Sequence, residues 1–207
     1  MKISKHVHSC LLVEERGRTM LIDPGDYSFE EGAIDAKSIS TLDFLLITHE
    51  HADHMHTPLV KQLASKFPEL KIISNSSVAD ILGKEGLTVS TEGNEFIKVI
   101  AAPHEKVLGK TPENAMFQIF NKLTHPGDSH SFNSTTKILA MPVQAPWGSF
   151  VAAIEKAAEL KPKIVIPIHD WHWKDKARKK LYEIAADYLS RLGINFKAAE
   201  TGEVVEV

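Results

Sequence analysis

His49-Glu50-His51-Ala52-Asp53-His54 is the stretch that governs the interpretation of this chain, because it places three imidazoles and a carboxylate within six positions. It follows the apolar segment 42–47, which predicts a strand. Imidazole and carboxylate groups suit zinc, iron or manganese, and alternate residues of an extended segment project the same way. We therefore expect His49 and His51 to share one metal ion. Asp53 and His54 come one turn later, so the stretch predicts two adjacent ions.

Three more residues with metal-ligating side chains follow strand-like stretches farther along the chain. His104 comes after the apolar run 96–102, His169 after 163–168, and Asp128 lies in His-Pro-Gly-Asp-Ser. Strand ends and loops are where a rigid sheet presents functional groups. A structural zinc site has four closed ligands, often cysteines. Seven candidate ligands without a cysteine among them therefore favour an open site that holds water.

The pattern His-x-His-x-Asp-His, followed by a single His, a Gly-Asp-Ser and a final His, resembles the metallo-β-lactamase superfamily of hydrolases. His8-Ser9-Cys10, Ile22-Asp23-Pro24 and Pro167-Ile168-His169 are most similar to its lactonase-like branch, which includes the phosphorylated-ascorbate lactonase. The similarity spans essentially the whole chain. It implies an α+β fold, an αββα sandwich of two mixed sheets with outer helices, as a single metallo-hydrolase domain over residues 1–207.

The resemblance also implies a role for each candidate ligand. His49, His51 and His104 would bind the first metal, and Asp53, His54 and His169 the second. Asp128 would bridge the two. Asp53 is also the expected catalytic residue, because it would orient the hydroxide between the metals. His8 would support the ligands from a neighbouring strand.

Apolar periodicity predicts more strands than helices, with helices interrupting both halves of the chain. We expect strands at 7–13, 19–22, 42–47, 71–74, 96–101, 116–120, 137–141, 163–168 and 195–198, and helices at 57–66, 78–82, 150–160 and 174–192. This pattern suits two packed sheets with helices outside, and it argues against a singly wound parallel sheet. Without the motif it would indicate only an α/β or α+β fold.

Composition narrows the class of protein further. The 207 residues contain no linker-like stretch, and 43% are hydrophobic, which suffices for one sizeable core. No apolar run approaches the roughly 20 residues of a membrane span, and the first residues lack a secretory signal, so we expect a soluble, cytoplasmic protein. Cys10 is the only cysteine, which excludes an internal disulfide. The net charge of -3 carries no nucleic-acid signature.

The expected activity is that of a dinuclear metal-dependent hydrolase, with two divalent metals that we expect to be zinc, or alternatively manganese or iron. A bridging hydroxide would attack a small, anionic ester, lactone or phosphoester. A nucleotide phosphodiesterase of the same fold and a non-catalytic metal-binding module stay open as alternatives. A flavin-assisted di-iron oxidoreductase fits less well, because it usually has an acidic residue at the position of His51 and needs a flavin domain. The sequence leaves the oligomeric state, pathway and substrate open.

Five residues near the predicted strand ends are candidates for the pocket or for support of the ligands. His130 and His172 follow Asp128 and His169 closely, and each is a candidate general acid, a group that supports the ligands, or a solvated loop residue. Trp147, Trp171 and Trp173 stand in loops on the same rim. They would either form an apolar wall of the substrate cleft or cover the edges of the core.

Overall fold

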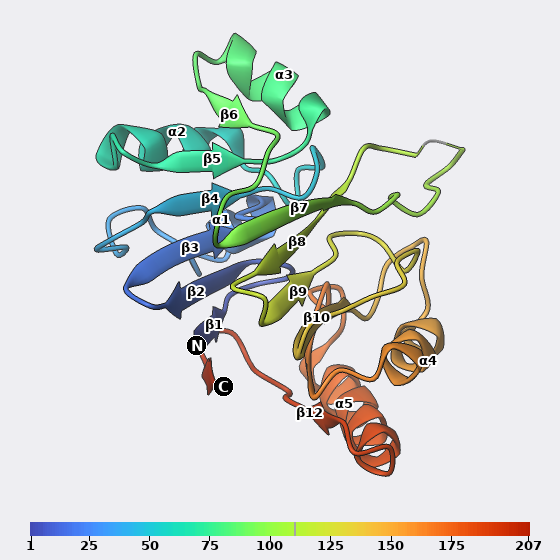
Figure 1. Ribbon diagram of the computed structural model, residues 1–207. Helices are drawn as coiled ribbons and strands as arrows, with labels where there is room; N and C mark the ends of the chain where they lie inside the picture. Colours follow the sequence, from blue (N-terminus) through green and yellow to red (C-terminus); the bar gives the residue numbers. More distant parts are fainter. Residues whose placement is uncertain (110) are drawn as a thin grey trace. The chain divides into compact units, whose positions relative to one another are not determined.

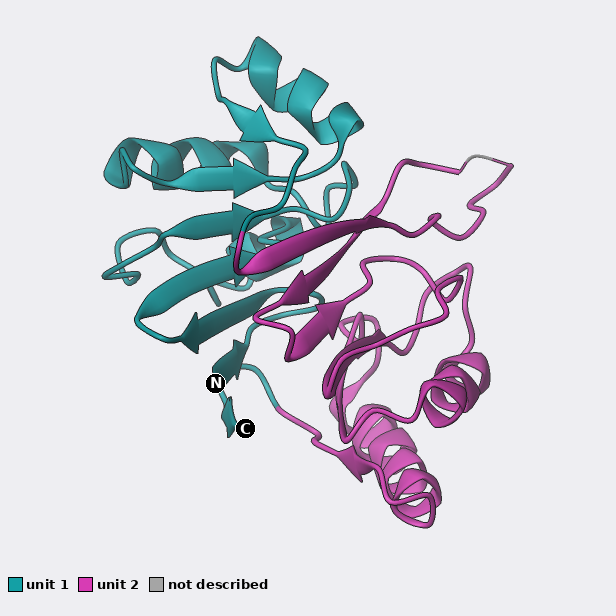
Figure 2. Ribbon diagram, in the orientation of Figure 1, with its two compact units in different colours: residues 1–94, 200–207 teal, residues 95–199 magenta. Residues whose placement is uncertain are grey.

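The chain forms two mixed β-sheets in the computed structural model, which describes residues 1–109 and 111–207. Each sheet belongs to its own compact unit (Figure 2). Unit 1 comprises Met1–Asn94 and Glu200–Val207, and unit 2 comprises Glu95–Ala199. Mixed sheets with helices confirm the α+β class and the two-sheet composition expected from the sequence. The assignment of residues 1–207 to a single domain stays a prediction.

The sheet of unit 1 has seven strands in the order β13-β1-β2-β3-β4-β5-β6 (Figure 1). Strands β13, β1, β2 and β3 pair antiparallel, whereas β3 to β6 pair parallel. The strands are β1 Lys2–Lys5, β2 Leu11–Glu15, β3 Arg18–Ile22, β4 Phe44–Leu46, β5 Lys71–Ile73, β6 Val89–Ser90 and β13 Val204–Glu206. The helices are α1 Asp26–Glu30, α2 Thr57–Lys66 and α3 Ser76–Lys84.

Helices α2 and α3 form because each has local start signals and one apolar face. Proline stands in the first turn of α2, where its missing N–H costs nothing. The Asn75 side chain caps α3 by accepting a hydrogen bond from the amide of Val78. Leu59 and Leu63 of α2 and Leu82 of α3 are buried in the same apolar cluster as strand β4. This cluster fixes β4, and therefore the segment that follows it.

The sheet of unit 2 has six strands in the order β12-β11-β10-β9-β8-β7. Strands β7, β8 and β9 pair antiparallel, and β9 to β12 pair parallel. The strands are β7 Ile97–Ala101, β8 Ala115–Ile119, β9 Leu123–His125, β10 Ile138–Pro142, β11 Ile164–Ile168 and β12 Asn195–Phe196. Helices α4 Phe150–Leu160 and α5 Asp175–Ser190 pack apolar side chains such as Ile154 and Leu189 into the core of this unit.

The expected strand at 7–13 is wrong in its first half. Residues 7–10 form a turn, in which the amide of Cys10 donates to the carbonyl of Val7 and His8 has φ 63. Strand β2 begins only at Leu11. The expectations also missed β1, β6, β9, β13 and α1, which contain two to five residues each and so show little periodicity. Within the described residues, no helix has both the length and the apolar character needed to cross a membrane.

Candidate metal centre

In unit 1 the His49–His54 stretch directly follows the parallel strand pair β3 and β4. Ile22 pairs with Leu46 at the last position of both strands, so the residues that follow them emerge at the same sheet edge. Asp23 comes after β3, and its amide donates to the carbonyl of Leu46 at 2.9 Å. Topology therefore places Asp23 beside the start of the histidine-rich stretch.

The carboxylate of Asp23 organises this stretch from a fully buried position. It accepts hydrogen bonds from the Thr48 amide at 2.7 Å, the Thr48 hydroxyl at 2.7 Å and Nδ1 of His54 at 2.8 Å. Because an ionised carboxylate only accepts, His54 carries its proton on Nδ1. Its Nε2 lone pair is then the one available to a metal, which is the usual arrangement of a carboxylate, a histidine and a metal. Sequence reasoning gave Asp23 no role in the site.

Thr48 fixes His49 in the same way. The Thr48 hydroxyl donates its proton to Asp23, so its oxygen accepts from Nδ1 of His49, which lies 3.0 Å away. His49 and His54 are both fully buried, and their ring centroids lie 4.0 Å apart. The ring of His51 stands 4.7 Å from that of His49. The paired imidazoles that the motif predicts are therefore brought together in unit 1.

Asp53 lies at the open side of this cluster, with 22% of its side chain exposed. Its Oδ2 is 3.1 Å from Nε2 of buried His8 and 3.8 Å from Nε2 of His54. The left-handed backbone of His8, at the turn before β2, directs its ring to this carboxylate. His8 thus contacts a predicted ligand, as its expected supporting role requires.

Gly25 permits a very close approach of two backbone segments behind the predicted ligands. A Cβ atom at Gly25 would lie 1.9 Å from the carbonyl oxygen of Asp53 and 2.5 Å from the amide nitrogen of His54. On either side of this contact, the Asp26 amide donates to Ala52 at 2.7 Å and the His56 amide to Pro24 at 3.0 Å. The segment 23–26 therefore forms a rigid support for residues 52–56.

In unit 2 the three predicted ligands come from the ends of separate strands. Asp128 follows β9 and His169 follows β11, at the same edge of the parallel part of the sheet. His104 follows β7. Asn114, which is buried, joins the loops that carry His104 and Asp128, because its amide donates to the carbonyls of Ala102 and Pro126 at 2.9 Å each. The Asp128 amide donates in turn to Asn114.

The histidines of unit 2 direct their Nε2 atoms to one carboxylate oxygen. Nε2 of His169 lies 3.2 Å, and Nε2 of His104 3.5 Å, from Oδ2 of Asp128. On the other side of each ring, Nδ1 faces a backbone carbonyl, that of Gln144 for His169 and that of Glu105 for His104. A carbonyl cannot donate, so each Nδ1 carries a proton, and in the neutral form of each ring the lone pair is on Nε2. Three electron-rich atoms therefore converge within unit 2.

The remaining candidates divide according to their contacts in unit 2. His130 donates from Nε2 to the carbonyl of Pro142 at 2.9 Å. Burial lowers the pKa of His130, although that carbonyl and two nearby carboxylates act in the opposite direction. Trp147 donates from its indole to Asp128. The ring of Trp173 meets that of Phe150 edge-on at the core. The rings of Trp171 and His172 are exposed and contact each other. The apolar wall stays a prediction.

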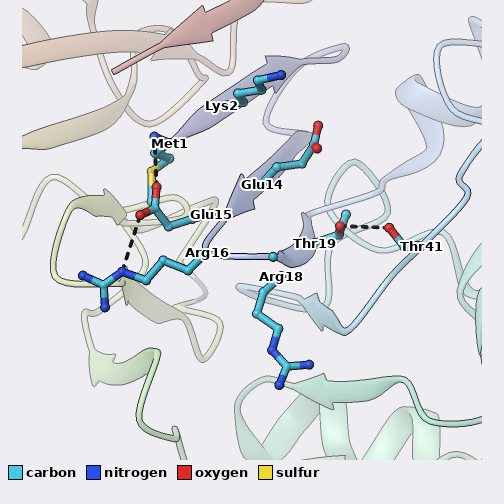
Figure 3. Close-up of a pocket in the computed structure, with 9 residues that line it drawn as sticks. Met1, Lys2, Glu14, Glu15, Arg16, Arg18, Thr19 and Thr41 are labelled. Carbon is cyan, nitrogen blue, oxygen red and sulfur yellow. Dashed lines mark hydrogen bonds and ion pairs between the residues drawn. The ribbon is translucent and has the colours of Figure 1, made fainter.

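A surface hollow of about 410 Å³ in unit 1 is separate from the predicted ligands of that unit (Figure 3). It includes Arg18, where β3 begins, whereas Asp23 follows the other end of that strand. Arg16 and Glu15 form an ion pair beside it, and Thr19 contacts Thr41. The hollow therefore lies at the end of β3 opposite to the one from which Asp23 follows.

The protein-family comparison agrees with the ligand pattern. The family model described as a beta-lactamase superfamily domain matches residues 2–169 of this chain. The chain belongs to the metallo-β-lactamase superfamily. Membership in this superfamily of hydrolases confirms the resemblance deduced from the His-x-His-x-Asp-His pattern, while the lactonase-like branch stays a prediction.

Individual metallo-β-lactamase relatives cover most of the chain. UPF0173 protein PF0020 of Pyrococcus furiosus is 29% identical in an alignment 187 residues long that covers 82% of this chain and 83% of that protein. Igni18, a metallo hydrolase from Ignicoccus hospitalis, has a TM-score of 0.71 at 19% identity, covering 99% of this chain and 97% of its own. CmlA, a diiron beta-hydroxylase from Streptomyces venezuelae, has a TM-score of 0.70 at 16% identity, covering 100% and 54%. The two structures show the shared fold.

Proposed function

We propose that this protein is a dinuclear metal-dependent hydrolase that acts on a small, anionic ester, lactone or phosphoester. The observation that carries the proposal is the convergence of His104, His169 and Asp128 in unit 2. When both imidazoles are neutral, their lone pairs and the carboxylate oxygen that they face repel one another unless a cation lies among them. Backbone carbonyls hold both rings in that orientation from behind.

The donor set fits a divalent metal in both units. Each unit supplies imidazole nitrogens and carboxylate oxygens, and the lone cysteine, Cys10, is buried. Burial raises the pKa of its thiol, which keeps it protonated and unsuited to a metal. Nitrogen and oxygen ligands suit zinc, manganese or iron, and we propose zinc. Hydrogen bonds donated by Nδ1 of His49 and His54 select the same tautomer in unit 1 as in unit 2.

We assign the two ions to the ligands that the sequence pattern predicts. His49, His51 and His104 would hold one ion, Asp53, His54 and His169 the other, and Asp128 would serve both. Candidate groupings of metal-ligating side chains in the described residues contain these seven residues, and His8 joins the group of Asp53 and His54. His8 would either hold the metal or orient Asp53 through their 3.1 Å contact.

Bound together, two divalent ions would lower the pKa of a shared water towards about 7 and polarise the scissile bond. Asp53 would orient that water, since its carboxylate is partly exposed and held by His8. Two divalent ions, two carboxylates and one hydroxide leave the site about one charge positive, so an anionic substrate is favoured. The lactone preference rests on the resemblance. The cytoplasmic location likewise stays a prediction.

Metal analysis followed by a substrate panel tests the proposal. Protein reconstituted with zinc, manganese or ferrous iron should bind two ions per chain and hydrolyse a member of a panel of anionic lactones, phosphodiesters and thioesters. His104→Ala and His169→Ala should each weaken binding, whereas His56→Ala, a histidine outside the ligand set, should still bind two ions. A wild-type chain that binds fewer than two ions at saturating metal would overturn the dinuclear assignment. Two bound ions without hydrolysis would favour the metal-binding module.

A further inference from the structure

A tight turn in unit 2 lies between strand β10 and helix α4. The amide of Ala145 donates to the carbonyl of Gly148 at 3.3 Å, and the amide of Gly148 donates back to Ala145 at 3.2 Å. Pro146 and Trp147 form the tip between them. Just before the turn, the Val143 amide donates to the carbonyl of Ile168 at 3.0 Å. The turn is therefore tied to the end of β11, from which His169 follows.

Two predicted ligands form hydrogen bonds with this turn or with the residue directly before it. The Gln144 carbonyl accepts from Nδ1 of His169. The indole Nε1 of Trp147 donates to Oδ2 of Asp128 at 3.1 Å. The same ring meets the edges of the His104 and His169 rings, with centroids 6.0 and 5.9 Å away. Trp147 thus contacts every predicted ligand of unit 2.

The indole is itself held in place. The ring of His130 stands edge-on to it at 5.1 Å, and His130 is fixed by its hydrogen bond to Pro142. Gly148 makes room for this contact, because a Cβ there would lie 3.1 Å from Cε1 of His130. The amide of His130 also donates to Glu105, which accepts from Ser131 as well. Few orientations of the Trp147 ring are compatible with these contacts.

We propose that Trp147 is a positioning residue, whose indole N–H fixes the Asp128 carboxylate in the orientation that two metal ions require. This inference rests on the proposed function. A carboxylate on a short side chain can rotate, and one that serves two ions must be held in a single orientation. An indole is suited to fix it, because it donates one directional hydrogen bond and carries no charge to oppose the metals. Loss of such a supporting hydrogen bond typically weakens metal binding tenfold to about a hundredfold.

Trp147→Phe tests the hydrogen bond, because it keeps an aromatic ring and removes the N–H. We expect two-ion binding in the wild type, and in the variant at least about tenfold weaker binding of zinc in competition with a chelating dye. The visible absorption spectrum of the cobalt(II)-loaded variant should also change. Trp173→Phe removes an indole N–H from the same unit without touching Asp128, and should leave zinc affinity and spectrum unchanged.

A double-mutant cycle separates positioning from general packing. In an Asp128→Ala background, Trp147→Phe should produce no further loss of zinc affinity, because the acceptor is gone. An equal loss in both backgrounds overturns the positioning role. Trp147→His keeps a ring N–H and should retain more zinc affinity than Trp147→Phe. If Trp147→Phe does not fold, Trp147→His can be compared with the wild type instead. Wild-type zinc affinity and spectrum in Trp147→Phe overturn this inference alone. A wild-type chain that binds no zinc or cobalt overturns it together with the proposed function.

Discussion

Gly25→Ala should damage the candidate site without altering any residue that carries its chemistry. The Cβ atom of alanine would lie 1.9 Å from the carbonyl oxygen and 2.0 Å from the carbonyl carbon of Asp53. Cβ atoms essentially never approach other heavy atoms closer than 3.0 Å. The obstacle is backbone, which cannot rotate aside as a long side chain can. One of the two segments must therefore retreat by about 1 Å or more.

The size of the effect follows from what that movement breaks. The segments are joined by the bonds from Asp26 to Ala52 and from His56 to Pro24, at 2.7 and 3.0 Å, and by the contact of His54 with Asp23. Three hydrogen bonds at about 1 kcal/mol each, or more for the buried one to the Asp23 carboxylate, give a loss of about 2–4 kcal/mol. Metal ligands tolerate displacements of only about 0.2 Å. A shift of Asp53 and His54 should therefore weaken metal binding at least about a hundredfold.

Urea unfolding of the metal-free protein measures the first effect, and zinc competition with a chelating dye measures the second. Gly83→Ala is the matched control. Gly83 lies within helix α3, where an added Cβ atom would have open space around it, and its replacement should stabilise the protein by about 0.5–1 kcal/mol. If Gly25→Ala unfolds at the wild-type urea concentration and binds zinc with wild-type affinity, the tight support of the motif by residues 23–26 is refuted.

Three further predictions concern single residues. Asp53→Asn should lower turnover at least about a hundredfold on any established substrate while the unfolding curve stays unchanged, and near-normal turnover would remove its catalytic role. Burial alone would raise the pKa of Asp43, but hydrogen bonds from the Thr19 amide and Arg18 lower this pKa below 3.8. The ionised Asp43 therefore stabilises the fold above about pH 4, and this stabilisation is lost as pH falls through the lowered pKa. Asp43→Asn should thus lower the free energy of unfolding by up to about 1 kcal/mol at pH 7, with solvent screening included, and by less at pH 3. An equal loss at both pH values would contradict the lowered pKa. Because His169 has φ 63, metal-free His169→Gly should be about 1 kcal/mol more stable to urea than His169→Ala, and equal stabilities would argue against backbone strain there.

The ligand candidates could be predicted because they lie where strands end and because their order along the chain is characteristic. The motif follows β4, and the single candidate ligands follow β7, β9 and β11. Short elements could not be predicted in the same way. Strand β9 has three residues, and its pairing with β8 and β10 is decided by neighbours rather than by periodicity. The strand expected at 7–13 is wrong over residues 7–10, because the apolar run that follows does not reveal the turn closed by the Cys10 amide and the Val7 carbonyl.

The groups that hold the ligands in place are mostly hidden from the sequence. Asp23 has a weak local signal, as a charged residue between apolar Ile22 and Pro24, but its partner His54 lies 31 positions away. The carbonyls of Gln144 and Glu105 have no signal at all, because every residue has a carbonyl. The sequence draws attention to Trp147 for its apolar surface, whereas the structure engages its N–H. Residue type indicates which groups can bind a metal, while only the fold determines which atom of each is presented.

The backbone conformation of three residues in or beside the candidate site indicates how much stability the site geometry takes from the fold. His8, Asp23 and His169 have φ 63, 46 and 63, in the left-handed region that favours glycine. For other residues this conformation costs roughly 1 kcal/mol or more. Glycine would cost less at each position, yet each carries a side chain that contacts a predicted ligand or is one. Each also follows or precedes a strand end, where the chain must turn sharply. The same turn that strains the backbone aims the imidazole or carboxylate, so local stability and the geometry of the site are set by one feature.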